Sequence, residues 1–132
     1  MKKLLSILLV SVLALAFSPD VPVVTEKDGL VLINTTTLCA QYEGYNGPTP
    51  VLITLKEGKV AQVQALPNQE NPAYFELLKE EKLFERWNGL SASDAAELEV
   101  DIVSGATYSS DAIIHNVRSG LIFYLKSTKN QP

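Results

Sequence analysis

The chain has 132 residues and a mass of 14.4 kDa, which is the size of one domain. Hydrophobic residues make up 46% of the sequence and charged residues 20%, which favours a packed core and excludes a disordered chain. The formal net charge is -4, so the protein has no electrostatic basis for binding nucleic acid.

The first residues, MKKLLSILLVSVLALAF, have the pattern of a secretory signal. Lys2 and Lys3 precede an apolar run that is shorter than the roughly 20 residues that a membrane-spanning helix needs. The sequence ALA at residues 14–16 fits a cleavage site, so residues 1–16 are interpreted as a signal peptide, with an uncleaved membrane anchor as the alternative. This interpretation predicts export to the periplasm or the cell surface.

The segment after the signal contains prolines and mostly polar residues, so residues 17–29 are expected to be a linker and residues 30–128 a folded domain. Cys39 is the only cysteine and therefore cannot form an internal disulfide. It is expected to be a small buried hydrophobic residue, with a free thiol as the alternative.

Strands are expected in the first half of the domain. Apolar and β-branched residues at 30–45 predict one or two strands that end near Gly44. The runs VLITL at 51–55 and KVAQVQAL at 59–66 flank KEGK and predict a hairpin. Alternation in the second run places Val60, Gln62 and Gln64 on one face, and Ala61, Val63 and Ala65 on the other.

A helix is expected at residues 71–87. Asn71 would be its N-cap, and Pro72 would occupy the first helical position, where the missing N–H has no cost. Gly89 would follow its end. The apolar stripe of this helix would contain Tyr74, Leu77, Leu78, Leu83, Phe84 and Trp87.

The rest of the domain is expected to hold a short helix at residues 91–99, a strand at 98–103 and a last helix that begins at residue 109 or 110. The face of the last helix that packs on the sheet would present Ile113, Ile114, Val117, Leu121 and Ile122. Strands with a central hairpin, followed by helices, indicate an α+β fold with a small antiparallel sheet.

Hydroxyl-bearing side chains are concentrated in DIVSGATYSSD, residues 101–111. A glycine-containing loop before a helix exposes N–H groups without intrahelical partners, and the helix dipole adds partial positive charge, so an anion would fit there. No lysine follows the glycine as in a nucleotide P-loop, and G-x-G-x-x-G is absent from the sequence. The residues alone leave two interpretations, a phosphate site and a serine-capped turn without a ligand.

The stretch DIVSGAT, from Asp101 to Thr107, resembles the flavinylation motif D-x-x-S/T-G-A-T of FMN-binding domains. Such domains occur in subunits of the sodium-pumping NADH:quinone oxidoreductase and of Rnf-type electron-transfer complexes. The segment GYNGPTPVLITLKEGKV at 44–60 is also similar to the family's early glycine-rich turn and hairpin. The resemblance implies an FMN-binding domain at residues 30–128, with FMN joined to a threonine by a phosphoester bond. It also implies a separate flavin transferase that acts outside the cytoplasm with FAD and a divalent metal.

The resemblance assigns roles to the residues that match the motif. Thr107 is the acceptor of FMN, and Asp101 is the acidic position needed for modification. The turn that lets the phosphate approach the backbone is formed by Ser104, Gly105 and Ala106.

The residues after the motif are expected to complete the site. Tyr108 would pack against the flavin ring, and Ser109 or Ser110 would cap the helix and hydrogen-bond the phosphate. Further aromatic candidates to line the ring, with plain core packing as the alternative, are Tyr42, Tyr45, Phe84 and Trp87.

An unassisted threonine hydroxyl is a weak nucleophile. The sequence has one histidine, His115, expected on the helix surface or in packing, and no carboxylates at metal-ligand spacing, so self-attachment of FMN is not expected. The function indicated is an electron carrier between a membrane reductase and an extracytoplasmic acceptor, rather than an enzyme with its own substrate. The alternatives are a module that binds FMN or another phosphate ligand non-covalently without a redox role, and an exported structural protein.

Overall fold

The structure, a computed structural model, describes residues 21–38, 43–44 and 47–129. The predicted signal peptide at 1–16, together with Cys39, Tyr42 and Tyr45, lies outside the described residues. In the described part of the chain, none of the helices combines the length and the apolar character needed to cross a membrane.

A four-stranded antiparallel sheet forms one layer of the molecule. Its strands, in spatial order, are β1 (Val24–Lys27), β2 (Leu30–Asn34), β5 (Val51–Lys56) and β6 (Lys59–Ala65). β3 (Glu43–Gly44) and β4 (Gly47–Pro48) pair with each other in a separate two-stranded ladder. β1 falls within the stretch expected to be a linker, and it pairs with β2 from Val24 opposite Ile33 to Lys27 opposite Leu30.

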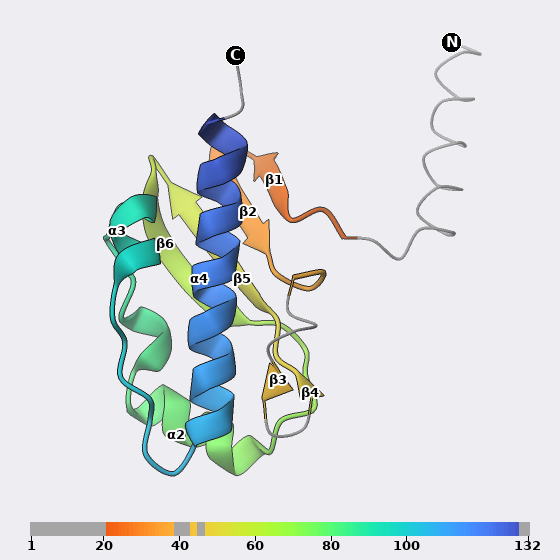
Figure 1. Ribbon diagram of the computed structural model, residues 1–132, viewed down its shortest axis with the longest axis vertical. Helices are drawn as coiled ribbons and strands as arrows, with labels where there is room; N and C mark the ends of the chain where they lie inside the picture. Colours follow the sequence, from red (N-terminus) through yellow and green to blue (C-terminus); the bar gives the residue numbers. More distant parts are fainter. Residues whose placement is uncertain (1–20, 39–42, 45–46, 130–132) are drawn as a thin grey trace, which may run out of the picture.

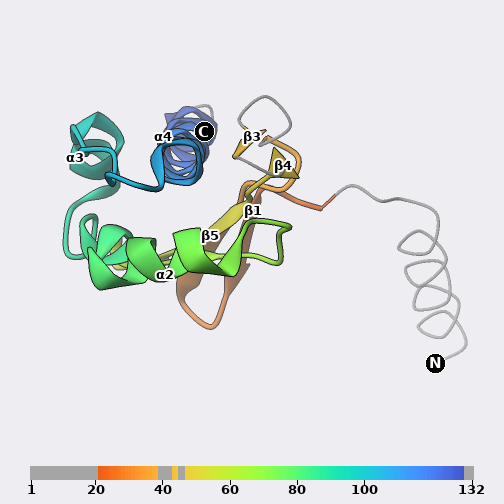
Figure 2. The same ribbon diagram turned by 90° about the horizontal axis from the view of Figure 1, so that it is seen from below.

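The remaining elements are helices. They are α2 (Pro72–Glu80), the short 3-10 helix η2 (Leu83–Glu85), α3 (Ala92–Glu97) and α4 (Thr107–Lys129). Figure 1 shows the long helix α4 running along one face of the sheet, with α2 next to its first turn. The view from below in Figure 2 places α3 beside α4 on the same side of the sheet. The fold is therefore α+β, as the sequence predicts.

The predicted hairpin is confirmed, but the predicted faces of its second strand are wrong. β5 and β6 pair across the turn at Glu57 and Gly58. Thr54 lies opposite Gln62 and Leu55 opposite Val60, so Ala61 is an extra residue in a β-bulge. The bulge shifts the alternation by one residue, and Val60 and Val63 both point into the core.

The predicted helix at residues 71–87 is interrupted. Its start is confirmed, because Asn71 Oδ1 accepts the N–H of Ala73 at 2.8 Å and Pro72 follows as the first helical residue. The helix ends at Glu80, and Lys82 adopts a left-handed conformation with a φ of 55° before η2 begins. The break redirects the chain between α2 and η2, so the two halves of the expected stripe belong to different elements.

Helix α4 lies unusually close to the sheet at Gly120. A Cβ atom on this residue would lie 2.9 Å from Thr35 Cγ2 and 3.1 Å from Ile33 Cγ2 and Ile53 Cδ1. Glycine is therefore required here by space. The helix residues packed into the core around this contact are Ile113, Val117 and Leu121, whereas Ile122, predicted to pack there, is 39% exposed.

Gly120→Ala is expected to lower the free energy of unfolding by about 1–3 kcal/mol, because the added methyl group overpacks the contact between α4 and the sheet. Urea denaturation measures the change. The matched control is Lys126→Ala, an exposed position on the same helix, which should change stability by less than about 0.5 kcal/mol. An unchanged or increased stability of Gly120→Ala would contradict this account of the contact.

Candidate functional site

A tight turn carries the centre of the motif. The N–H of Ala106 donates to the carbonyl of Val103 at 3.0 Å, and Gly105 has a φ of 86°. A positive φ at the third residue of such a turn is the type II geometry, which favours glycine. A Cβ on Gly105 would also lie 3.3 Å from Leu77 Cδ1 of α2. The turn is therefore pressed against α2 at a position that suits glycine alone.

Helix α4 begins at Thr107, two or three residues earlier than predicted. Its first helical hydrogen bond runs from the N–H of Ser110 to the carbonyl of Ala106 at 2.9 Å. The residue at the N-cap position is thus Ala106, which has no side-chain oxygen to bind the N–H groups of the first turn. Ser109 and Ser110 lie within the first turn of the helix, and each is at most 1% exposed. The prediction that one of them caps the helix is therefore wrong.

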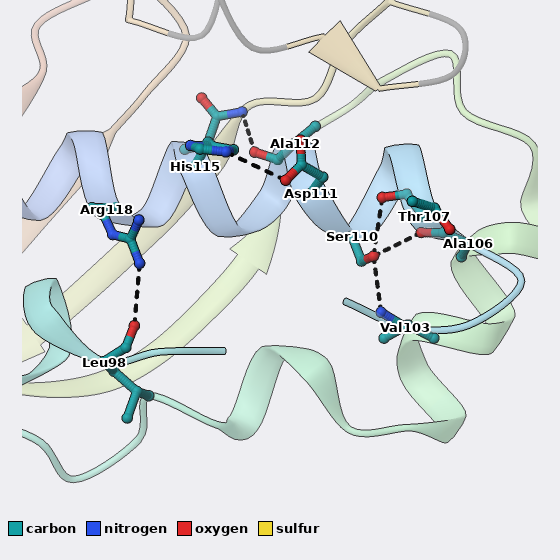
Figure 3. Close-up of polar contacts among 10 residues, drawn as sticks. Leu98, Val103, Ala106, Thr107, Ser110, Asp111, Ala112, His115 and Arg118 are labelled. Carbon is teal, nitrogen blue, oxygen red and sulfur yellow. Dashed lines mark hydrogen bonds and ion pairs between the residues drawn. The ribbon is translucent and has the colours of Figure 1, made fainter. Parts of the chain in front are cut away.

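Ser110 joins the turn to the helix. Its hydroxyl accepts the N–H of Val103 at 3.0 Å and donates to the carbonyl of Ala106 at 2.8 Å, with the carbonyl of Thr107 at 3.2 Å. Figure 3 shows these contacts meeting at one oxygen between the loop and the first turn of α4. The hydroxyl therefore supplies an acceptor for the Val103 N–H and a second donor for the Ala106 carbonyl, and these bonds hold the turn, with Thr107 after it, to the helix.

The strand predicted at residues 98–103 is absent from this described segment. Its backbone is held by arginine side chains instead of a neighbouring strand: Arg118 donates to the carbonyl of Leu98 at 3.4 Å (Figure 3), and Arg86 to that of Asp101 at 2.9 Å. Arg86 also reaches the carbonyl of Glu81 at 3.4 Å. The β-branched residues of this segment therefore lie in an extended loop that tertiary contacts position.

A cleft of about 230 Å³ opens at the start of α4. It is lined by Tyr74 from α2 and by the consecutive residues Gly105, Ala106, Thr107, Tyr108 and Ser109. Tyr108 is 66% exposed, and Thr107 is also exposed to solvent. The cleft thus combines an accessible hydroxyl, two tyrosines from different helices and the amino end of a long helix.

A buried glutamate accepts a hydrogen bond from a residue of the cleft lining. Glu70 is 8% exposed, and its Oε1 accepts a hydrogen bond from the Ser109 hydroxyl at 3.1 Å. Ser109 was expected to face a phosphate, but in the structure its hydroxyl is directed to Glu70. The sequence analysis did not identify Glu70, because it lies 39 residues from Ser109 in the chain.

The other predicted residues divide into those in the cleft and those elsewhere. Asp101 and Ser104 are exposed on the loop that leads to the turn. Trp87 is 2% exposed in the core, and Phe84 stacks edge-to-face on Phe75 with ring centroids 6.3 Å apart. Trp87 belongs to the core, and Phe84 packs against the core and lines a separate groove. Both therefore fit plain core packing, the alternative to lining the flavin ring. Two tyrosines line the cleft: Tyr108, which was expected to pack against the ring, and Tyr74, which was expected only in an apolar stripe.

His115 lies on the surface of α4, as expected, with its Nε2 3.3 Å from Asp111 Oδ1 one turn earlier (Figure 3). Across the described ranges, no group of three or more His, Cys, Asp or Glu side chains is placed to hold a metal ion.

The arrangement suits a phosphate ester. An anion at the amino end of α4 would meet the first-turn N–H groups and the positive end of the dipole, where Ala106 provides no side-chain cap. The exposed Thr107 hydroxyl stands at this end of the helix and can form the ester. The glycine turn keeps side chains away from the backbone there, so the residues present fit the phosphate end of a nucleotide cofactor.

Comparison with known proteins agrees with a site for a phosphate-bearing cofactor. A family model described as an FMN-binding domain matches residues 44–122, well over half of the chain. The matched range begins at β3 and ends within α4, so it includes the turn, the cleft and Glu70. No curated protein matches the sequence.

Ser110→Ala is expected to lower the free energy of unfolding by about 1–3 kcal/mol, because the buried N–H of Val103 loses its acceptor. Hydrogen exchange at the Val103 amide should accelerate as well. The control is Ser127→Ala, which removes a hydrogen bond from the Ser127 hydroxyl to the Tyr124 carbonyl near the end of the helix. It should lower the free energy of unfolding by less than about 0.5 kcal/mol. Equal effects of the two substitutions would show that Ser110 does not hold the turn.

Proposed function

Because the chain belongs to the FMN-binding domain family, we propose that it carries FMN covalently on Thr107 as an exported electron-transfer protein. In this proposal, electrons pass between a membrane reductase and an extracytoplasmic acceptor. The observation that carries it is the exposed Thr107 hydroxyl, the first residue of α4, in the lining of the cleft. The D-x-x-S/T-G-A-T sequence from Asp101 to Thr107 supports the same residue.

The bond would form by exchange at phosphorus. Thr107 Oγ1 attacks the phosphorus atom of the FMN half of FAD, AMP leaves from that phosphorus, and the hydroxyl proton is released. The product is a phosphoester between Thr107 and FMN. A separate flavin transferase with a divalent metal would catalyse this step.

The surroundings of Thr107 support an external catalyst. A threonine hydroxyl needs a base or a metal beside it to act as a nucleophile. His115 lies about two helical turns further along α4 and contacts Asp111. The Ser110 hydroxyl is already engaged with Val103 and Ala106. An exposed acceptor residue on a short loop-to-helix junction is also accessible to an enzyme.

The size of the cleft favours covalent over non-covalent retention. Pockets that bury a whole ligand usually measure about 300–1,000 Å³. The cleft beside Thr107 measures about 230 Å³ and is open, so it can cover only part of FMN. Occupancy of a weak site depends on the concentration of free ligand. A covalent bond removes this dependence.

The chain's residues would position the cofactor rather than act on a substrate. FMN, when bound, supplies one- and two-electron transfer, and the protein sets its position and surroundings. Tyr74 and Tyr108 provide aromatic faces at the cleft on which a flat ring can stack. We therefore propose a carrier that exchanges electrons with partner proteins at the surface.

Co-expression with an active flavin transferase is expected to give a protein whose flavin fluorescence survives denaturation on a gel. Its intact mass should exceed that of the bare chain by one FMN less one water. Thr107→Val should abolish both signals, because valine preserves the shape but has no hydroxyl. Thr128→Val, an exposed threonine near the other end of α4, should leave both signals intact.

Two outcomes would overturn the proposal. Retention of the flavin by Thr107→Val after denaturation would exclude this residue as the attachment site. Flavin that is bound in the native protein but lost on denaturation, with an active transferase present, would favour a non-covalent FMN module instead.

Tyr74→Leu is expected to increase the fluorescence of the attached flavin in the folded protein, because a stacked tyrosine quenches an excited flavin by electron transfer. The measurement compares emission per flavin before and after denaturation. Tyr124→Leu is the control, since Tyr124 lies on α4 but not in the cleft. Equal emission from both variants and the unmodified sequence would place the ring away from Tyr74.

A further inference from the structure

Glu70 is a buried acidic side chain that the proposed attachment chemistry does not use. It is 8% exposed, whereas glutamate is rarely buried unless its carboxylate is bonded. Its Oε1 receives the Ser109 hydroxyl at 3.1 Å, and both residues are buried. The contact joins the segment between β6 and α2 to the first turn of α4.

The chain around Glu70 is fixed locally on both sides. Asn68 Oδ1 accepts the N–H of Glu70 at 2.9 Å, while Asn68 Nδ2 donates to the carbonyl of Leu66 at 2.9 Å. Asn71, the next residue, caps α2. The backbone is therefore held at Glu70, so its carboxylate has a defined position relative to α4.

This position places negative charge behind the cleft. The Ser109 hydroxyl at the amino end of α4 donates its hydrogen to the Glu70 carboxylate. Ser109 also lines the cleft, as does Tyr74, four residues after Glu70. Since Glu70 is buried, its field reaches the cleft with less screening than that of a surface glutamate.

We propose that the fixed negative charge of Glu70 lowers the reduction potential of the flavin attached at Thr107. This inference rests on the proposed function. Reduction of the ring by two electrons with uptake of one proton adds one negative charge, and a fixed carboxylate nearby disfavours that charge. The electrons come from the reductase in the proposed function and from dithionite in the test.

The test is a dithionite titration of the flavinylated full-length protein with a reference dye. Glu70→Gln keeps the size of the side chain and an oxygen that accepts from Ser109, but removes the charge. It is expected to raise the midpoint potential by about 30 mV or more, which corresponds to a tenfold shift of a two-electron equilibrium. The matched control is Glu76→Gln, an exposed glutamate on α2, which should leave the potential unchanged.

Two further variants separate charge from packing. Glu70→Asp retains the charge and should keep the potential closer to that of the unmodified sequence than Glu70→Gln does. Glu70→Met removes the charge without needing the Ser109 hydrogen bond, and it provides the uncharged comparison if the amide variant does not fold.

A folded, flavinylated variant without the charge at residue 70 whose potential equals that of the unmodified sequence would overturn the inference. An equal rise in Glu76→Gln would overturn it as well, because the effect would then be a general one of net charge. Failure of the unmodified sequence to retain flavin on a denaturing gel would instead overturn the proposed function. The two failures are therefore distinguishable.

Discussion

The bonds made by one hydroxyl, that of Ser110, connect the functional turn to the rest of the fold. This oxygen accepts from the backbone before the glycine and donates to the backbone after it, so the turn cannot move independently of α4. The position of Thr107 is therefore set by the helix. The helix in turn is set by the sheet, because Gly120 allows its backbone to approach Ile33 and Ile53 closely. Packing far from the site thus determines the site's geometry.

Helix α4 serves two purposes along its length. Its middle turns bury Val117 and Leu121 against the sheet, where the stabilisation comes from apolar burial. Its first turn stands clear of the sheet and presents Thr107 to solvent, while Ser109 on the other side bonds to Glu70. A rigid helix anchored along its middle can hold an accessible group at its first residue without a large pocket around it.

Local patterns in the sequence predicted the parts of the structure that depend on neighbouring residues. The hairpin at 51–66, the Asn71 cap and the position of Gly105 in a turn before a helix follow from turn and cap chemistry. The failures arise where distant segments meet. The segment at 98–103 has strand propensity but is held by arginines from other elements, and Ser110 was read as a cap although its partner is the folded-back Val103. Glu70 has no local signal at all, because its role comes from contact with α4.

The small, open cleft and the proposed ester are related, because both bear on how the cofactor is retained. A non-covalent cofactor is retained by burying its surface, and burial also increases the distance between the ring and any partner protein. The cleft here is small and open, and Tyr108 at its edge is 66% exposed. If Thr107 carries FMN, one covalent bond retains the cofactor without burial, and the ring can stay close to the surface. The protein then needs to supply only an aromatic contact, a fixed charge and a rigid attachment point, which are the features that a domain of this size provides.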